Sequence, residues 1–200
     1  MTTFLRQRVW PALALLLALT LITGVAYPVF VTVVAQVAFP SQANGSFIVT
    51  ADGRTIGSSL IGQAFSKDVY FWGRPSAAGA TDQNPAGYDA NSSAGSNLGP
   101  TSKVLIDRIA ADVDRLKAAN GGGPVPVDLV TTSASGLDPD ISPAAAEYQV
   151  ARVATARSMS EDDVRAMVAR HTQGPVLGFL GQPRVDVLML NLDLDGLLAP

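Results

Sequence analysis

A long stretch without any charged side chain constrains this chain more than any other feature. From Val9 to Ala51 the sequence holds no Asp, Glu, Lys or Arg, and residues 12–39 are almost entirely apolar. A hydrocarbon core of about 30 Å is crossed by roughly 20 helical residues. We therefore expect a transmembrane helix over residues 11–39. Pro28 lies inside it and is expected either to kink the helix or to separate two helical stretches.

A cleaved signal peptide is the main alternative for such an N-terminus, but its apolar region is only about 7–15 residues long. The run here is much longer, and a small-residue cleavage candidate, residues 41–43, lies far from the basic end. Arg6 and Arg8 precede the run, whereas the next basic residue is Arg54. Because cytoplasmic flanks carry the excess of Lys and Arg, we expect residues 1–10 in the cytoplasm. Residues 40–200 are then periplasmic or extracellular.

The composition of the chain excludes several classes of protein. The net charge is −3 and no Lys/Arg cluster is present, so we expect no nucleic-acid contact and no polybasic membrane patch. Without cysteine and with a single histidine, a disulfide scaffold and a thiolate metal site are excluded, and we expect no metal site. The part that follows the anchor, about 160 residues, is long enough for one domain held by its own core.

Strand and helix patterns in the exported part are typical of an α+β domain. Residues 46–50 and 55–62 predict a hairpin around Asp52-Gly53. Capping residues and apolar periodicity predict helices over residues 102–120, 142–157 and 160–171. Residues 176–180 and 185–194 predict a closing hairpin, because leucines occupy every second position from Leu188 to Leu194. The expected fold is α+β, with terminal strands around a helical middle. The apolar stripe of the first of these helices is expected at Val104, Leu105, Ile109, Val113 and Leu116.

Two features of the domain are candidate contact surfaces. Tyr70, Phe71 and Trp72 form the densest aromatic cluster, with Arg74 beside them. Taken alone, an aromatic residue is more often packed in a core or loop than part of a binding platform. An arginine beside such residues can simply lie across a ring. Residues 77–100 are rich in Gly, Ala, Asn, Ser and Pro, and loops of this length are usually functional or disordered. We expect this loop to present polar groups to a protein partner.

Motifs that carry catalysis are missing from the sequence. It contains neither G-x-x-x-x-G-K-[ST] nor G-x-S-x-G, which excludes a P-loop and a nucleophile elbow. A hydrolase that uses Ser135, His171 and Asp138 is a minor alternative, since His171 is the only histidine available as a base. We therefore expect the chain itself not to be an enzyme.

Several strings of the sequence are distinctive when they are taken together and in order. They are residues 57–63, Phe71 with residues 74–77, residues 95–101, residues 130–143 apart from positions 132 and 140, residues 152–154, and residues 187–192 apart from position 189. In these strings the chain resembles one known family, the C subunit of the Kdp potassium-transporting ATPase. The resemblance covers essentially the whole chain, including the single N-terminal membrane span. Ser102, Asp140 and Asp186 stand where the resemblance leads us to expect Asn, His and Asn.

The resemblance implies an accessory subunit of an ATP-driven potassium uptake complex in a bacterial inner membrane. Its implied partners are a channel-like subunit that binds potassium, a P-type subunit that hydrolyses ATP, and a small membrane subunit. The chain lacks the D-K-T-G-T phosphorylation sequence of P-type pumps, so it is not the subunit that forms the aspartyl phosphate. The implied role is to assemble or stabilise the complex as an exported cap near the point where potassium enters. Candidate partner contacts are Tyr70, Phe71, Trp72, Arg74 and Asn97.

A second role implied by the family is that of a catalytic chaperone, which raises the ATP affinity of the pump subunit through a shared nucleotide. ATP would then be a ligand reached through the complex, with Ser133, Ser135 and Gly136 as candidate nucleotide-binding residues. No other cofactor is expected. The charge asymmetry opposes this alternative, because ATP is cytoplasmic and the domain is expected outside.

Overall fold

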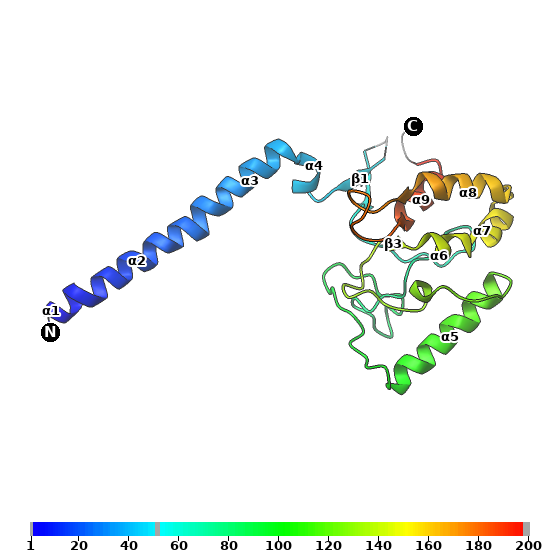
Figure 1. Cartoon of the computed structure of the whole chain (residues 1–200), viewed down its shortest axis with the longest axis horizontal. Helices are drawn as coiled ribbons and strands as arrows, with labels where there is room; N and C mark the ends of the chain where they lie inside the picture. The colour runs from blue at the N-terminus through cyan, green and yellow to red at the C-terminus, as the bar shows by residue number, and fades with distance from the viewer. Residues whose placement is uncertain (1, 51–52, 198–200) are drawn as a thin grey trace. The chain divides into compact units, whose positions relative to one another are not determined.

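The computed structural model describes residues 2–50 and 53–197, and the chain divides into two compact units, Met1–Phe47 and Ile48–Pro200. Figure 1 shows a long helix in the first unit and a mixture of short helices, strands and coil in the second. The α+β class expected from the sequence is confirmed.

The N-terminal unit is one nearly continuous helix. Its segments are α1 (Thr2–Phe4), η1 (Leu5–Val9), α2 (Trp10–Leu21), η2 (Ile22–Ala26) and α3 (Tyr27–Ala38). Both η1 and η2 are π-helical, and each comes just before a proline, Pro11 or Pro28. Proline donates no backbone hydrogen bond and crowds the preceding turn, and a wider π turn accommodates this without ending the helix. Pro28 therefore does not divide the span.

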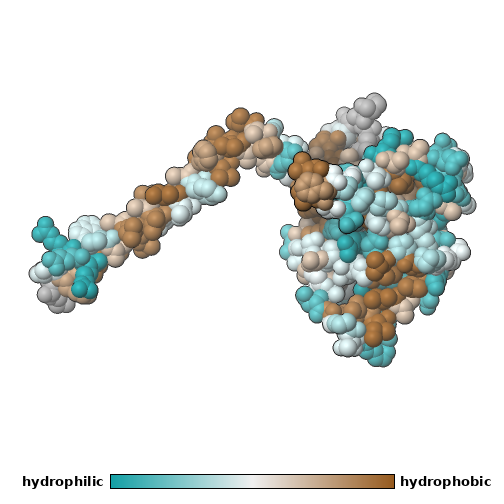
Figure 2. Space-filling model, in the orientation of Figure 1, coloured by the Kyte–Doolittle hydropathy of each residue, from teal (hydrophilic) through white to brown (hydrophobic). Residues whose placement is uncertain are grey.

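Residues Arg6–Ala38 form a helix long and apolar enough to cross a membrane by length and composition, and none of it is buried inside the protein. Figure 2 shows apolar surface along this helix on the face toward the viewer. The helix ends at Phe39, whose φ of −140° is not helical, and the short α4 (Pro40–Ala43) follows. A reciprocal pair of amide hydrogen bonds links Gln36 to Asn44 across this end, at 3.1 and 3.3 Å.

A two-stranded sheet of β1 (Phe47–Val49) and β2 (Thr55–Ser58) comes next along the chain. The return strand stops at Ser58, earlier than the expected residue 62. Asp52 of the expected turn lies outside the described residues, and Gly53 adopts a φ of +82°. Beside the hairpin, the nearest neighbours of Gly57 include the Leu188 side chain, which lies in the last helix of the domain.

Residues 59–102 form a long coil without helix or strand. The helix α5 (Lys103–Ala119) follows, and its bounds agree closely with the prediction. Leu116 of the expected apolar stripe is buried, and Ile109 and Val113 pack against the core, but Val104 is 66 % exposed. Val104 was therefore wrongly assigned, because it lies in the first turn, at the end of the stripe farthest from Leu116. A short 3₁₀ helix, η3 (Val127–Leu129), comes next.

The helix expected over residues 142–157 is divided in two, α6 (Pro143–Glu147) and α7 (Val150–Arg157). At the break the Gln149 N–H donates to the Ala146 carbonyl, in a 3₁₀ pattern, rather than one residue further back. The Gln149 side chain donates to the Ala145 carbonyl instead, at 3.1 Å. The side chain thus takes the carbonyl that the Gln149 N–H would use in an α-helix, and this explains the break. Ser142 caps α6 as expected, accepting from Ala145 N–H.

The third helix, α8 (Glu161–Arg170), is capped by Ser160, in agreement with the prediction. A small antiparallel sheet of order β3-β5-β4 lies beside the helices, built from β3 (Asp140–Ile141), β4 (Thr172–Gln173) and β5 (Arg184–Asp186). Ile141 and Thr172 both pair with Val185.

The expected closing strand is wrong beyond Asp186, where the chain becomes the helix α9 (Val187–Leu194). Asp186 caps this helix by accepting from Met189 N–H at 2.9 Å. The alternating leucines misled the prediction because α9 is buried on most sides. Its buried residues are Val187, Leu188, Leu190, Asn191 and Leu192. Residues 176–180 form no strand and are joined only by an isolated bridge between Val176 and Leu180.

The core lies where α6, α7, α8 and α9 pack around β5 and the segment Phe71–Trp72. Its largest fully buried side chains include Phe71, Leu116, Leu129, Leu188 and Leu190. Burying such a side chain contributes about 1.5–3 kcal/mol, so this core stabilises the domain without any disulfide.

Candidate functional site

Two buried side-chain amides hold the aromatic segment Phe71–Trp72 in the interior. Asn191 accepts from Phe71 N–H at 2.8 Å and donates to the Phe71 carbonyl at 3.0 Å. Gln149 does the same for Trp72, at 2.8 and 3.1 Å. An amide side chain offers one acceptor and two donors, so each amide takes the place of a neighbouring strand. The segment is thereby fixed although it belongs to no sheet.

Two arginines lie over the Trp72 ring, with Arg152 at 4.1 Å and Arg115 at 5.0 Å from the ring centroid. Arg152 is only 8 % exposed, and burial lowers its pKa to about 10. It therefore stays charged at neutral pH. Its guanidinium donates to the Asp68 and Tyr70 carbonyls, and to Gln149 Oε1 at 2.7 Å. This arginine joins α7 to the coil that leads into the aromatic segment.

The five residues expected to contact a partner differ in exposure. Phe71 is 0 % and Trp72 7 % exposed, so both are core residues that leave little or no surface for a partner. Tyr70 is half-buried, and its hydroxyl donates to Asp195 at 2.8 Å, which raises its pKa. Asn97 is exposed and adopts a φ of +51°. Of these five, only Tyr70, Arg74 and Asn97 present more than a small part of their surface.

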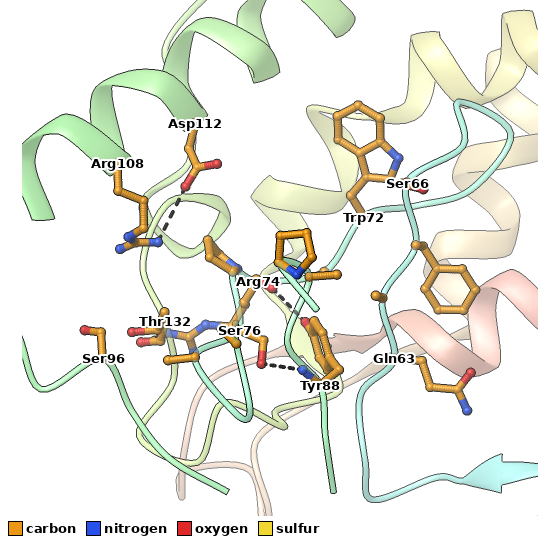
Figure 3. A pocket seen from close by; sticks show the side chains of 18 of the residues that line it. Gln63, Ser66, Trp72, Arg74, Ser76, Tyr88, Ser96, Arg108, Asp112 and Thr132 are labelled. Carbon is orange, nitrogen blue, oxygen red and sulfur yellow. Dashed lines mark hydrogen bonds and ion pairs between the residues drawn. The ribbon is translucent and has the colours of Figure 1, made fainter. Parts of the chain in front are cut away.

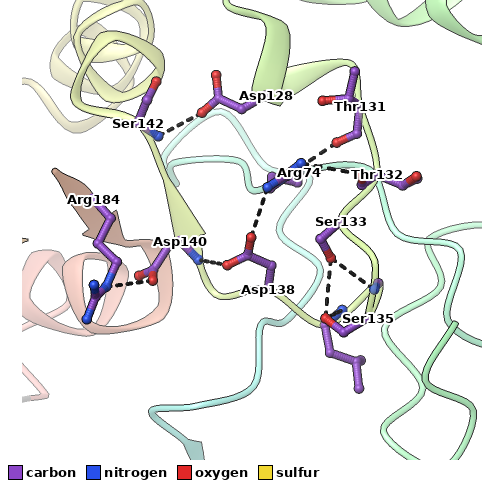
Figure 4. A network of polar contacts seen from close by, with 12 residues as sticks. Arg74, Asp128, Thr131, Thr132, Ser133, Ser135, Asp138, Asp140, Ser142 and Arg184 are labelled. Atoms are coloured by element: carbon purple, nitrogen blue, oxygen red, sulfur yellow. Dashed lines mark hydrogen bonds and ion pairs between the residues drawn. The ribbon is translucent and has the colours of Figure 1, made fainter. Parts of the chain in front are cut away.

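Arg74 is the centre of a polar network that ties two stretches of the chain together (Figure 4). Its Nη1 pairs with Asp138 at 2.9 Å, and its Nε and Nη2 donate to the Thr131 and Thr132 carbonyls at 3.3 Å. Asp138 in turn accepts from Asp140 N–H at 3.0 Å. A guanidinium has five N–H donors in a fixed plane, so one side chain can hold several acceptors. The network positions residues 131–140 against residues 70–76.

The turn that holds Ser133, Ser135 and Gly136 satisfies its own backbone donors. Gly136 N–H donates to Ser133 Oγ at 2.9 Å and Leu137 N–H donates to Ser135 Oγ at 3.1 Å. Gly136 has a φ of +68°, and a Cβ there would lie 2.5 Å from the Ala94 carbonyl oxygen. These three residues are therefore close together, but both of these N–H groups are already engaged within the turn.

The loop of residues 77–100 is anchored at several points, although it contains no helix or strand. The Tyr88 hydroxyl donates to the Arg74 carbonyl at 2.7 Å, and Tyr88 N–H donates to Ser76 Oγ at 2.9 Å (Figure 3). Burial raises the pKa of Tyr88 to about 12, so its hydroxyl remains a donor. Ala94 N–H donates to the Ser135 carbonyl at 2.9 Å. The loop thus packs against Gly136, which is buried, whereas Ala134 and Ser135 of the same turn stay exposed.

The residues of the minor hydrolase alternative each bond elsewhere. Asp138 pairs with Arg74. His171 Nε2 lies 2.9 Å from an Asp193 carboxylate oxygen. Ser135 Oγ accepts from Leu137 N–H and lies 3.4 Å from Ser133 Oγ. Among the described contacts, no hydrogen bond joins any two of these three residues, so they form no triad.

An apolar loop, which we define as residues 174–183, projects from the domain between β4 and β5. Its four large side chains are strongly exposed: Val176 55 %, Leu177 79 %, Phe179 74 % and Leu180 51 %. Two hydrogen bonds close it, between Val176 N–H and the Leu180 carbonyl at 2.8 Å and between Leu180 N–H and the Val176 carbonyl at 2.9 Å. Leu177 adopts a φ of +55°, which is costly for a bulky residue. The fold therefore holds apolar side chains outward.

Sequence reasoning missed the apolar loop because its aliphatic residues resemble a strand. The glycines and prolines in it, residues 174, 175, 178, 181 and 183, were the available signal, because they favour a projecting turn over a paired strand. The absence of charge across the whole loop is equally visible in the sequence.

Two acidic side chains, Asp140 and Asp186, are register partners across β3 and β5. Burial raises the pKa of Asp140 to about 6, with the Asp186 and Asp138 charges acting in the same direction. Arg184, 2.9 Å away, acts in the opposite direction. Burial also raises the pKa of Asp186.

Comparison with known proteins gives a consistent result over nearly the whole chain. The family model described as "K+-transporting ATPase, c chain" matches residues 9–196. A protein named "Potassium-transporting ATPase KdpC subunit" from Rhodopseudomonas palustris is 58 % identical, with 94 % of this chain and 98 % of the relative covered. The protein of the same name from Sorangium cellulosum is 59 % identical, with 93 % of this chain and 96 % of the relative covered. That from Caulobacter vibrioides is 55 % identical, with 95 % of this chain and 93 % of the relative covered. With its apolar N-terminal helix and its mixed helix and strand domain, the chain belongs to the KdpC family of potassium-transporting ATPase subunits.

Proposed function

We propose that this chain is a non-catalytic accessory subunit, which assembles and stabilises the complex of the channel-like potassium-binding subunit, the ATP-hydrolysing subunit and the small membrane subunit. Its single helix anchors it in the inner membrane, and its domain acts as a cap outside the cytoplasm, near the point where potassium enters. Family membership makes it one subunit of a larger assembly. The finer role is our inference from the surface of the domain.

The observation that carries this proposal is the apolar loop. Monomeric soluble domains rarely hold a contiguous group of large apolar side chains so far exposed, and such groups mark interaction sites. Here two backbone hydrogen bonds fix the loop, so little entropy would be lost when a partner covers it. A partner that covers Leu177 and Phe179 would bury apolar side chains that the domain itself leaves exposed.

A protein partner fits the apolar loop better than a lipid surface. Segments that lie at a membrane interface usually combine apolar side chains with Trp and with Lys or Arg. Residues 174–183 contain none of these three residue types. The loop is also without acidic residues, so its contact depends on shape and burial and not on charge. We therefore assign it to an uncharged apolar surface of another subunit.

The charge of the domain is consistent with a place near incoming cations. Arg6 and Arg8 are the only charged residues before residue 48, so the remainder carries −3 − (+2) = −5. A negatively charged surface raises the local concentration of cations, and the effect falls as ionic strength rises. This supports the cap role more weakly than the apolar loop does.

Co-purification tests the proposal. We expect a double variant, Leu177→Ser with Phe179→Ser, to lower the yield of the other subunits recovered through a tag on this chain by several-fold. A matched control, Val104→Ser with Val127→Ser, removes side chains that are 66 % and 71 % exposed in other elements. Exposed substitutions change stability little. Equal recovery of the complex with both variants would refute the role of the loop.

The catalytic-chaperone alternative requires direct contact with ATP. The turn of Ser133, Ser135 and Gly136 gives it less support, because two backbone donors that a phosphate would need are bonded to the hydroxyls of the same turn. Titration of the full-length chain in detergent with ATP distinguishes the two roles. We expect no heat at millimolar ATP, and saturable heat would favour the alternative.

A further inference from the structure

A hollow of about 580 Å³ lies between α5 and the coil of residues 63–88, apart from the apolar loop. Much of its wall is apolar or aromatic, including Phe65, Trp72, Tyr88 and Leu98. Three arginines also line it, Arg74, Arg108 and Arg115. Figure 3 shows Arg108 extending from α5 toward the region occupied by Arg74, Ser96 and Thr132.

The guanidinium groups that line the hollow outnumber the carboxylates that pair with them. Arg74 pairs with Asp138. Arg108 and Arg115 share the single carboxylate of Asp112, at 3.5 and 3.3 Å. Three guanidinium groups therefore face two carboxylates, which leaves one positive charge. This excess stands out because the rest of the domain is net acidic.

Several hydrogen-bond donors that line the hollow also lack a good acceptor. Arg108 makes only long contacts, from Nη1 to Asp112 at 3.5 Å and from Nη2 to the Val130 carbonyl at 3.3 Å. Its buried Nε has no acceptor in the part of the chain that the structure describes. Within that same part, the hydroxyls of Ser96 and Thr132 have no hydrogen-bond partner. Several N–H and O–H donors thus converge on the hollow without a matching acceptor.

We propose that this hollow binds a carboxylate carried by an apolar or aromatic group. A carboxylate supplies one negative charge, which matches the excess, and its two oxygens match the planar fork of a guanidinium. A phosphate dianion would overcompensate the single positive charge. The apolar body of the ligand would lie against Phe65, Trp72 and Leu98. The carboxylate comes either from a free organic acid or from an acidic side chain of a neighbouring subunit.

Benzoate is a suitable probe for this chemistry, because it combines one carboxylate with an aromatic ring. The full-length chain in detergent, with Trp10→Phe, leaves Trp72 as its only tryptophan, and Trp72 lines the hollow. We expect benzoate to change the Trp72 fluorescence saturably, whereas benzamide, which has the same shape without the charge, and inorganic phosphate at equal ionic strength have little effect. An equal response to benzamide or to phosphate would overturn the proposal, as would no response to benzoate.

Variants on one helix separate the site from general charge effects. Arg108→Gln is expected to weaken benzoate binding at least tenfold, whereas Lys103→Gln, which removes the same charge from α5 outside the hollow, leaves it unchanged. Ser96→Ala removes a hydroxyl with no partner among the described residues, so it keeps the fold and still weakens binding by several-fold. Unchanged binding in Ser96→Ala and Arg108→Gln, or an equal loss in Lys103→Gln, would refute the site.

The assembled complex distinguishes the two sources of the carboxylate. If the ligand is a free organic acid, benzoate binds the isolated chain and the complex alike. If it is an acidic side chain of another subunit, benzoate binds only the isolated chain. Binding to neither would overturn the proposal. The measurement on the isolated chain needs no partner, so its failure is distinct from a failure of the assembly role.

Discussion

The buried amide of Gln149 provides a sharp test of how the domain is held together. Gln149 is 0 % exposed and makes two hydrogen bonds to the Trp72 backbone, one to the Ala145 carbonyl and one from Arg152. Gln149→Leu keeps a similar volume but removes all four. The Trp72 N–H and carbonyl would then be buried without partners, and Arg152 would lose one acceptor.

The expected cost follows from these lost bonds. A buried polar group left unsatisfied costs about 1–3 kcal/mol, so the two Trp72 groups alone cost about 2–6 kcal/mol. The greater apolar burial of leucine offsets about 1 kcal/mol. A central value of about 3 kcal/mol remains, which is a large part of a typical domain stability of about 5–15 kcal/mol. For a domain of this size it corresponds to a fall in Tm of roughly 6–12 °C.

Thermal unfolding followed by Trp72 fluorescence measures this change, in full-length protein with Trp10→Phe. A matched control, Gln83→Leu, replaces an exposed glutamine for which the described contacts include no side-chain hydrogen bond. We expect the control to melt within a degree or two of the parent. If Gln149→Leu melted at the same temperature as the control, the claim that side-chain amides hold the aromatic segment would fail.

Two further predictions concern the turn and the acidic pair. Gly136→Ala places a Cβ 2.5 Å from the Ala94 carbonyl oxygen and is expected to cost at least about 3 kcal/mol. The control is Gly181→Ala, also at positive φ but with no atom within 4 Å of the added Cβ, and it should cost only about 1 kcal/mol in denaturant unfolding. Equal losses in the two variants would contradict the packing of the 77–100 loop on the turn that holds Gly136. Because burial raises the pKa of Asp140 to about 6, this carboxyl favours the folded state at low pH, and its contribution is lost as the pH rises from about 4 to 6. Asp140→Asn should remove roughly 2 kcal/mol of this pH dependence. The measurement is the difference in unfolding free energy between pH 4 and pH 7, which should be smaller in the variant. An unaltered pH profile would contradict this prediction.

The helical parts of the fold were largely readable from the sequence. α5 and α8 begin and end close to where their caps and apolar periodicity predict, since their signals are local. The failure at α9 has a physical cause. A helix buried on most sides has no polar face, so its leucines read equally well as a strand, and only the Asp186 cap distinguished the two.

Tertiary contacts decided the features that the sequence could not show. Gln149 and Asn191 are ordinary polar residues in the sequence, and nothing local indicates that they serve the backbone of Phe71 and Trp72, which are far away in the chain. The break between α6 and α7 follows from the same Gln149 side chain. The hollow beside α5 likewise combines Arg74, Arg108 and Ser96 from three separate segments.

Cysteine labelling, which this cysteine-free chain allows, tests the proposed outward orientation of the domain and the proposed docking of the apolar loop together and most directly. Phe179→Cys is treated in spheroplasts with a maleimide that does not cross the membrane, and Val127→Cys, 71 % exposed in η3, is the control. The account predicts that Cys at position 127 is labelled throughout, whereas Cys at position 179 is labelled when the chain is expressed alone and protected when the other subunits are present. Labelling of either cysteine only after the membrane is opened, or equal labelling of position 179 with and without the other subunits, would contradict it.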